Sequence, residues 1–162
     1  MNDSPALSLE QSLDFFGDMV FRTAFGMVKN RQDAEDIAQE VFLTLVRKNP
    51  HFENQEHQKA WLLRSTINRC KSHLTSAWIR RRQELDDSLP CPFTPQENIV
   101  LDAVSHLPLK YRQVVYLHYI EGYTSAEIGA LLKINPNTVL SQLSRARTRL
   151  KEALKGEFAD EV

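Results

Sequence analysis

Apolar residues recur every three or four positions along most of the chain, a spacing that predicts α-helices and almost no β-strand. In the first half, the repeat indicates helices over residues 9–28, from a cap at Asn30 to about residue 48, and over about 56–82. Their apolar stripes are expected to meet in one core. These stripes contain Leu9, Leu13, Phe16, Val20, Ala24 and Met27, then Ala34, Ile37, Ala38, Val41, Phe42 and Leu45, then Ala60, Leu63, Ile67, Cys70, Leu74 and Ala77 or Trp78.

The periodicity stops after the third predicted helix. The stretch "QELDDSLPCPFTPQ" brings three prolines and several acidic residues with no regular spacing. Such a composition is typical of a flexible linker. Four more helices are predicted over about 96–106, 109–120, 125–132 and 136–155. The predicted fold is therefore all-α, with two small helical bundle domains (1–82 and 96–162) joined by a flexible, acidic, proline-containing linker (83–95).

The last two predicted helices have the features of a helix-turn-helix. Thr124 and Glu127 form a capping box, and Asn135 with Pro136 starts the final helix after a tight turn. Short polar side chains near a helix N-terminus, followed by arginines, suit a helix in the DNA major groove. The alternative is a helical hairpin that only packs. The predicted buried stripe of the final helix is Val139, Leu143, Ala146 and Leu150, and its outer face is Asn137, Ser141, Ser144, Thr148 and Lys151, with Arg145 beside them.

The net charge of −1 conceals two basic segments. Residues 56–82 carry a net charge of +6 and residues 137–155 one of +4. Binding of nucleic acid requires such local basic patches and does not require a positive net charge of the whole chain. The alternative is that these charged helix faces are only solvated.

Composition argues against several other classes of protein. Cys70 and Cys91 form no metal-binding motif, and the sequence shows neither a nucleophile–base pair nor a phosphate loop. No apolar run reaches the roughly 20 residues that span a bilayer, and the N-terminus lacks the pattern of an export signal. We therefore expect a cytoplasmic protein without membrane insertion, metal, cofactor or enzymatic activity.

Two further helix faces are candidates for binding. On the third helix, an aromatic ring stands among amides, hydroxyls and cations, which can stack on and hydrogen-bond to unpaired bases; alternatively, Trp61 belongs to the core. On the second helix, a leucine lies among exposed acidic and amide groups, which suggests a protein contact. The first face contains Trp61, Asn68, Ser72, Thr75 and Ile79, flanked by Arg64 and Lys71, and the second contains Asp36, Gln39, Glu40 and Leu43.

Three segments together resemble a bacterial sigma factor of the extracytoplasmic-function class. They are "DAEDIAQEVFLTL" (33–45), "AWLLRSTINRCKSHL" (60–74) and "LPLKYRQVVYLHYIEGYTSAEIGALLKINPNTVLSQLSRARTRL" (107–150). The resemblance covers almost the whole chain, and the segments stand in the order of the family. It implies a first domain that binds the coiled coil of the largest polymerase subunit and melts the minus-ten promoter element. The second domain would dock on the flap of the other large subunit and read the minus-thirty-five element.

The resemblance also implies roles for particular residues. The residues implied to bind polymerase are Asp36, Gln39, Glu40 and Leu43. Those implied to recognise the minus-ten element are Phe52 and Asn54, in a loop that captures a flipped base, and Trp61, Arg64, Asn68, Lys71, Ser72 and Thr75. Those implied to recognise the minus-thirty-five element are Thr124, Asn137, Thr138, Leu140, Ser141, Ser144, Arg145 and Arg147. Asn137, Leu140 and Gln142 depart from the family, which usually has glycine, lysine and arginine there.

The sequence thus predicts a promoter-recognition subunit whose partners are core RNA polymerase, promoter DNA and an anti-sigma factor. One alternative is a stand-alone helix-turn-helix regulator whose first domain dimerises. Another is an interaction protein that sequesters a partner without touching DNA.

Overall fold

The computed structural model describes residues 4–75 and 94–155, and every regular element in these two ranges is helical. The chain divides into two compact units, Met1–Pro90 and Cys91–Val162, which we describe separately. The predicted linker up to residue 93, and the predicted end of the third helix with Ala77, Trp78 and Ile79, lie outside the described residues.

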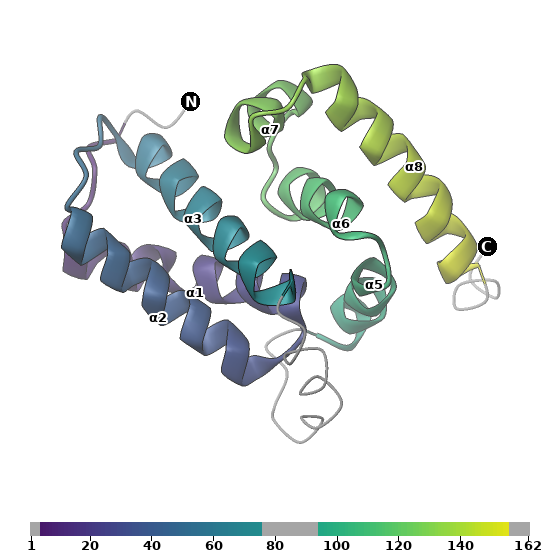
Figure 1. The fold of residues 1–162 in the computed structure, drawn as a ribbon, viewed down its shortest axis with the longest axis horizontal. Helices are drawn as coiled ribbons and strands as arrows, with labels where there is room; N and C mark the ends of the chain where they lie inside the picture. The colour runs from purple at the N-terminus through teal and green to yellow at the C-terminus, as the bar shows by residue number, and fades with distance from the viewer. Residues whose placement is uncertain (1–3, 76–93, 156–162) are drawn as a thin grey trace. The chain divides into compact units, whose positions relative to one another are not determined.

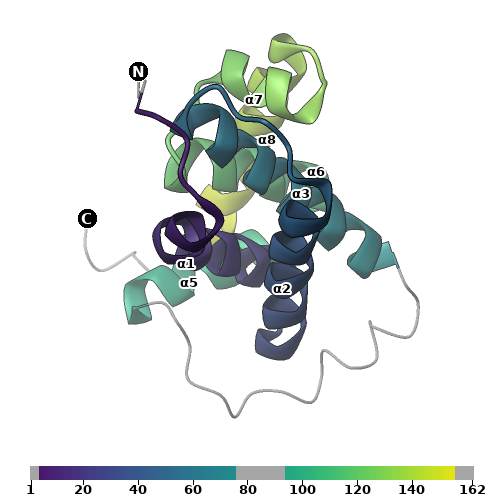
Figure 2. The same ribbon diagram turned by 90° about the vertical axis from the view of Figure 1, so that its left-hand side faces the viewer.

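The first unit packs three helices, α1 (Leu9–Val28), α2 (Arg31–Lys48) and α3 (Gln55–Thr75), each against the other two (Figures 1 and 2). Ser8 and Gln11 form a capping box at the start of α1, which was not predicted from the sequence. The side chain of Asn30 caps α2, as predicted. Before α1, the backbone of Leu7 exchanges two hydrogen bonds with the buried side chain of Gln58, at 2.9 and 3.1 Å. These bonds hold the N-terminal segment beside the start of α3.

The core of the first unit differs from the predicted stripes at the start of α1 and within α3. Phe16, Val20 and the rest of the α1 stripe are buried, but Leu9 and Leu13 are 45% and 53% exposed. Their burial was a wrong prediction, because the first turns of α1 lie at the surface beside α2. The prediction also missed Leu62, which is fully buried next to Leu63.

The second unit contains α5 (Pro95–Ser105), α6 (Leu109–Val115), α7 (Ser125–Leu132) and α8 (Pro136–Leu154). After α6, residues Tyr116–Ile120 form a π-helical turn, which the sequence did not predict. The predicted helix starts are confirmed: Thr124 and Glu127 form the capping box of α7, and Asn135 caps α8 with Pro136 in its first turn. The predicted stripe is confirmed too, with Val139, Leu143 and Ala146 buried and Leu150 packed against the core.

The turn between α7 and α8 depends on Gly129. A Cβ atom at this position would stand 2.8 Å from the carbonyl oxygen of Ile134 and 3.2 Å from Cγ of Pro136. Because the first of these atoms is backbone, it cannot move aside without shifting the turn. Gly129 therefore allows the two helices of the motif to approach closely.

We expect Gly129→Ala to destabilise the second unit by about 1–3 kcal/mol, as overpacking of a tight contact does. The measurement is amide hydrogen exchange on the full chain, which should accelerate in α7 and α8 but not in α1–α3. Gly17→Ala is the matched control, because a Cβ on Gly17 meets nothing within 4 Å. That change should stabilise α1 by about 0.5–1 kcal/mol. Unchanged exchange in α7 and α8 would contradict the role given to Gly129.

Candidate functional site

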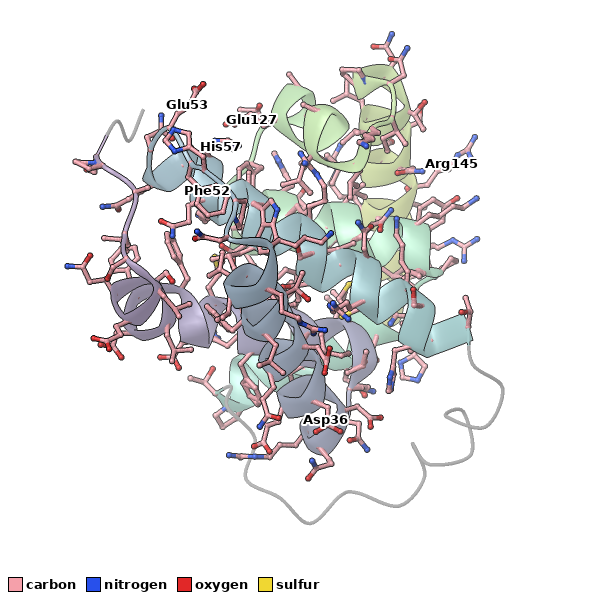
Figure 3. The ribbon with its side chains drawn as sticks, turned by 60° about the vertical axis from the view of Figure 1, so that its left-hand side comes forward. Asp36, Phe52, Glu53, His57, Glu127 and Arg145 are labelled. Atoms are coloured by element: carbon pink, nitrogen blue, oxygen red, sulfur yellow. The ribbon has the colours of Figure 1, made fainter. Side chains whose placement is uncertain are left out.

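The candidate residues of α2 form an exposed polar and apolar face. Asp36, Gln39, Glu40 and Leu43 are all exposed, and Leu43 retains half of its accessible surface. The Asp36 carboxylate accepts a hydrogen bond from Gln32 at 3.1 Å, and Glu40 pairs with Arg47 at 3.5 Å. Asp36 points outward from α2 in Figure 3. The face is therefore acidic and open to a partner.

An apolar groove of about 420 Å³ lies along this face, between α1 and α2. Four exposed aliphatic side chains line it: Leu9 and Leu13 from α1, and Leu43 and Val46 from α2. Sequence reasoning missed Leu9, Leu13 and Val46 as surface residues. The only signal was the apolar periodicity of α1, which cannot distinguish an exposed groove from a core. We call the groove together with Asp36, Gln39 and Glu40 the α1–α2 surface.

The loop before α3 contains an aromatic cluster. The Phe52 ring packs edge-on against His57, with centroids 5.4 Å apart, and against Trp61 at 5.9 Å. Asn54 accepts a hydrogen bond from the backbone N–H of His57 at 2.8 Å and so caps the start of α3. Figure 3 shows Phe52, Glu53 and His57 grouped in this region. Trp61 is half-buried, so its ring packs against the loop at Phe52 and remains partly accessible to solvent.

The other candidates on α3 lie further along the helix. Asn68, Ser72 and Thr75 are exposed, and Arg64 and Lys71 are half-buried. The Ser72 hydroxyl donates to the carbonyl of Asn68 at 3.2 Å, and Thr75 donates to that of Ser72 at 2.8 Å. The structure thus separates the minus-ten candidates into an aromatic group at the start of α3 and a polar group along it.

The candidate face of α8 is exposed over three turns. With 100° per residue, four short polar side chains occupy its centre, while Leu140 and Arg147 lie on one flank and Thr138 and Arg145 on the other. The central four are Asn137, Ser141, Ser144 and Thr148. Thr124 is exposed as well, but its hydroxyl is engaged by the backbone of Glu127 at 3.1 Å. The predicted outer face of α8 is confirmed as a surface.

Two tyrosines lie beside the arginines that flank this face. Arg147 donates a hydrogen bond to the hydroxyl of Tyr119 at 2.9 Å. On the opposite flank, the guanidinium of Arg145 beside the hydroxyl of buried Tyr111, with Lys110 and Arg149 nearby, lowers the pKa of that tyrosine. The Arg147–Tyr119 hydrogen bond links α8 to the segment 109–120 and orients Arg147 before any ligand arrives.

Two of the three departures from the family pattern within α8, Leu140 and Gln142, differ in their surroundings. Leu140 is half-exposed on the outer surface. Gln142 is half-buried, and its side-chain oxygen is turned away from solvent. Of these two residues, Leu140 is therefore the one placed to meet a ligand of α8.

Within the described residues, no group of three His, Cys, Asp or Glu side chains is arranged to hold a metal ion. No helix in those ranges is long and apolar enough to cross a membrane.

Both units match family models. Residues 16–80 match sigma-70 region 2, and residues 97–150 match sigma-70 region 4. Sigma factor CarQ of Myxococcus xanthus is 30% identical over 84% of this chain and 82% of its own. SigE of Mycolicibacterium smegmatis, an extracytoplasmic-function sigma factor, is 31% identical over 85% of this chain, which spans 58% of the SigE length. SigW of Bacillus subtilis, of the same class, is 29% identical over 88% of this chain and 87% of its own.

Two solved structures with the same fold are complexes. The sigma factor RpoE of Bartonella quintana, bound to the anti-sigma factor NepR, superposes with a TM-score of 0.72 at 24% identity, over 90% of this chain and 96% of its own. CnrH, bound to the cytosolic domain of CnrY, gives a TM-score of 0.66 at 19% identity, over 91% and 88% of the two chains. At these identities, the superpositions establish the fold alone.

Proposed function

Because the chain belongs to the extracytoplasmic-function class of RNA polymerase sigma factors, we propose specific roles for its three exposed surfaces in promoter-directed transcription. Sigma factors bind core RNA polymerase, direct it to promoters and catalyse no reaction. We assign polymerase binding to the α1–α2 surface, minus-ten recognition to the loop at Phe52 with the outer face of α3, and minus-thirty-five recognition to α8. The protein would act in the cytoplasm, where RNA polymerase works.

One observation carries this assignment: the candidate residues of both family regions are displayed on helices whose opposite faces form the cores. Leu43 is half-exposed while Val41 and Leu45 are buried, and Ser141 is exposed while Val139 and Leu143 are buried. The α1–α2 surface combines an apolar groove with carboxylates, which fits a partner helix that carries both aliphatic and basic side chains. The polar outer face of α8 fits the edges of base pairs.

We also propose that an anti-sigma factor covers the α1–α2 surface in the uninduced cell. The exposed aliphatic groove of about 420 Å³ supports this, since exposed apolar grooves in soluble proteins mark binding sites. That the Bartonella sigma factor was solved with its anti-sigma factor is consistent with the proposal. A pull-down from the native cell should then recover one stoichiometric protein besides polymerase subunits.

Binding to duplex DNA with and without core polymerase tests the proposal against a stand-alone regulator. A sigma factor has little affinity for its promoter duplex until polymerase is added, because polymerase supplies many of the DNA contacts. A stand-alone regulator would bind a palindromic duplex tightly without polymerase, since half-site symmetry mirrors that of a dimer. The measurement is a fluorescence anisotropy titration with the chain alone and with the assembled enzyme.

Leu140 allows a test of how α8 meets DNA. If its side chain faces a phosphate, Leu140→Lys should add one ionic contact and steepen the salt dependence of duplex binding by about 0.9 in log–log slope. If it packs on a thymine methyl group, the same change should weaken binding to the native site and reduce discrimination. Titrations of the holoenzyme on native and scrambled duplexes at several salt concentrations separate these cases. An unchanged slope and affinity would mean that Leu140 does not face DNA.

A further inference from the structure

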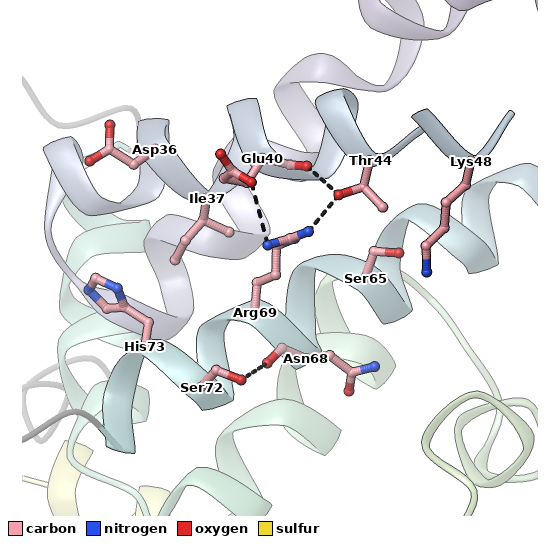
Figure 4. A pocket seen from close by; sticks show the side chains of 10 residues that line it. All are labelled: Asp36, Ile37, Glu40, Thr44, Lys48, Ser65, Asn68, Arg69, Ser72 and His73. Carbon is pink, nitrogen blue, oxygen red and sulfur yellow. Dashed lines mark hydrogen bonds and ion pairs between the residues drawn. The ribbon is translucent and has the colours of Figure 1, made fainter. Parts of the chain in front are cut away.

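A polar groove of about 570 Å³ runs between α2 and α3 (Figure 4). Its α2 wall includes Glu40, which we assign to polymerase binding. Its α3 wall includes Asn68 and Ser72, which we assign to the minus-ten element. The groove therefore connects two surfaces that the proposed function gives to different partners.

Arg69 crosses this groove from α3 to α2. Its Nη1 lies 3.7 Å from Oε2 of Glu40, and its Nη2 donates a hydrogen bond to the hydroxyl of Thr44 at 2.5 Å. Thr44 in turn donates its own proton to the carbonyl oxygen of Glu40 at 2.8 Å, which leaves a lone pair directed at Arg69. Glu40 and Thr44 thus hold the guanidinium of Arg69 against α2.

This link is open to competition. The side chains of Arg69 and Glu40 are 36% and 50% exposed, and Glu40 is shared with Arg47 at 3.5 Å. Ion pairs in solvent are weak, so another cation near Glu40 can replace Arg69. A guanidinium that loses its carboxylate is then available to a phosphate, which it binds with two parallel hydrogen bonds.

We propose that Arg69 binds a phosphate of the single-stranded promoter. In the free protein Glu40 restrains Arg69, and polymerase releases Arg69 when it engages Glu40. The proposal rests on the proposed function, because it takes Glu40 as a polymerase contact. It gives a physical order to assembly: polymerase binds α2 first, and α3 then gains a cation beside Asn68 and Ser72. It also supplies one reason for weak binding of DNA by the free chain.

The test uses the full-length chain without polymerase and a fluorescein-labelled dT12 oligonucleotide at several salt concentrations. Glu40→Gln keeps the shape of the side chain but removes the charge that restrains Arg69. We expect the affinity for dT12 to rise about two- to fivefold and the log–log salt slope to steepen by about 0.7, the value for one further phosphate contact on a single strand. Circular dichroism checks that the variant remains folded.

Two further variants separate release of Arg69 from simple loss of negative charge. Glu35→Gln removes the same charge from α2, but Glu35 pairs with Arg31 at 3.1 Å, and Arg31 lies over the Phe21 ring and does not line the groove. The change therefore adds no free cation beside Asn68 and Ser72, and the salt slope should stay at the wild-type value. Adding Arg69→Gln to Glu40→Gln should cancel the gain in slope. The proposal is overturned if Glu40→Gln leaves the slope unchanged, if Glu35→Gln matches it, or if the gain persists without Arg69. Wild-type transcription with core polymerase is assayed in parallel, so that failure of the proposed function is recognised separately.

Discussion

Replacing Leu13 or Leu43 with arginine is expected to weaken binding to core RNA polymerase by about 30-fold or more. The two leucines stand on different helices but line the same groove, with 53% and 50% of their surfaces exposed in the free protein. A partner helix seated there would bury both leucines, and a guanidinium at either position would be desolvated against the aliphatic and basic side chains of the partner. The affinity can be measured by competition with the wild-type chain for labelled core polymerase.

Phe15→Arg is the matched control for this experiment. Phe15 is also an apolar residue of α1, and it is 64% exposed, but it does not line the groove. Its replacement should leave polymerase binding within about twofold of wild type. Equal losses for all three variants would point to a general effect of added charge. Wild-type affinity in the Leu13 and Leu43 variants would remove the groove from the polymerase interface.

Arg145→Ala is expected to reduce discrimination of the minus-thirty-five element by about 5- to 150-fold, the range of one lost bidentate contact to a guanine. Arg145 lies on the flank of the exposed face of α8, and its side chain is exposed and placed to reach a base edge. The measurement is the affinity of the assembled polymerase for the promoter of this sigma factor, relative to the same duplex with a scrambled minus-thirty-five element.

Lys155→Ala removes one positive charge from the C-cap residue that follows α8. Ten residues along a helix correspond to about 15 Å, so this side chain lies well beyond the first turns that enter a groove. It should weaken binding to both duplexes alike. If Arg145→Ala also lowers both affinities equally, Arg145 contacts phosphates and does not read bases.

Local signals in the sequence predicted much of this fold. The caps at Asn30, Thr124 and Asn135 depend on side chains that bond to backbone three or fewer residues away, so a short window of sequence contains both partners. The stripe of α8 was correct for the same reason, because helical periodicity is local. The exposed faces of α2 and α8 then followed as the sides opposite the buried ones.

The features that the sequence did not predict depend on contacts between residues far apart in the chain. Leu9 and Leu13 continue the apolar stripe of α1. Whether they are buried depends on whether α2 and α3 cover the first turns of α1. Arg69 lies 25 residues from Thr44 along the chain, and no pattern in either helix indicates that they bond. The tyrosine contacts of Arg145 and Arg147 likewise require knowing how α8 packs on the segment 109–120.

Run-off transcription with purified core polymerase tests the central claim most directly. The template is a genomic promoter mapped upstream of transcripts that depend on this protein, and the comparison is core polymerase alone against core polymerase with the full-length chain. We predict a discrete transcript that requires both components and disappears with Leu43→Arg. Failure to produce a transcript, together with tight binding of the free chain to a palindromic duplex, would contradict the account and identify a stand-alone DNA-binding regulator.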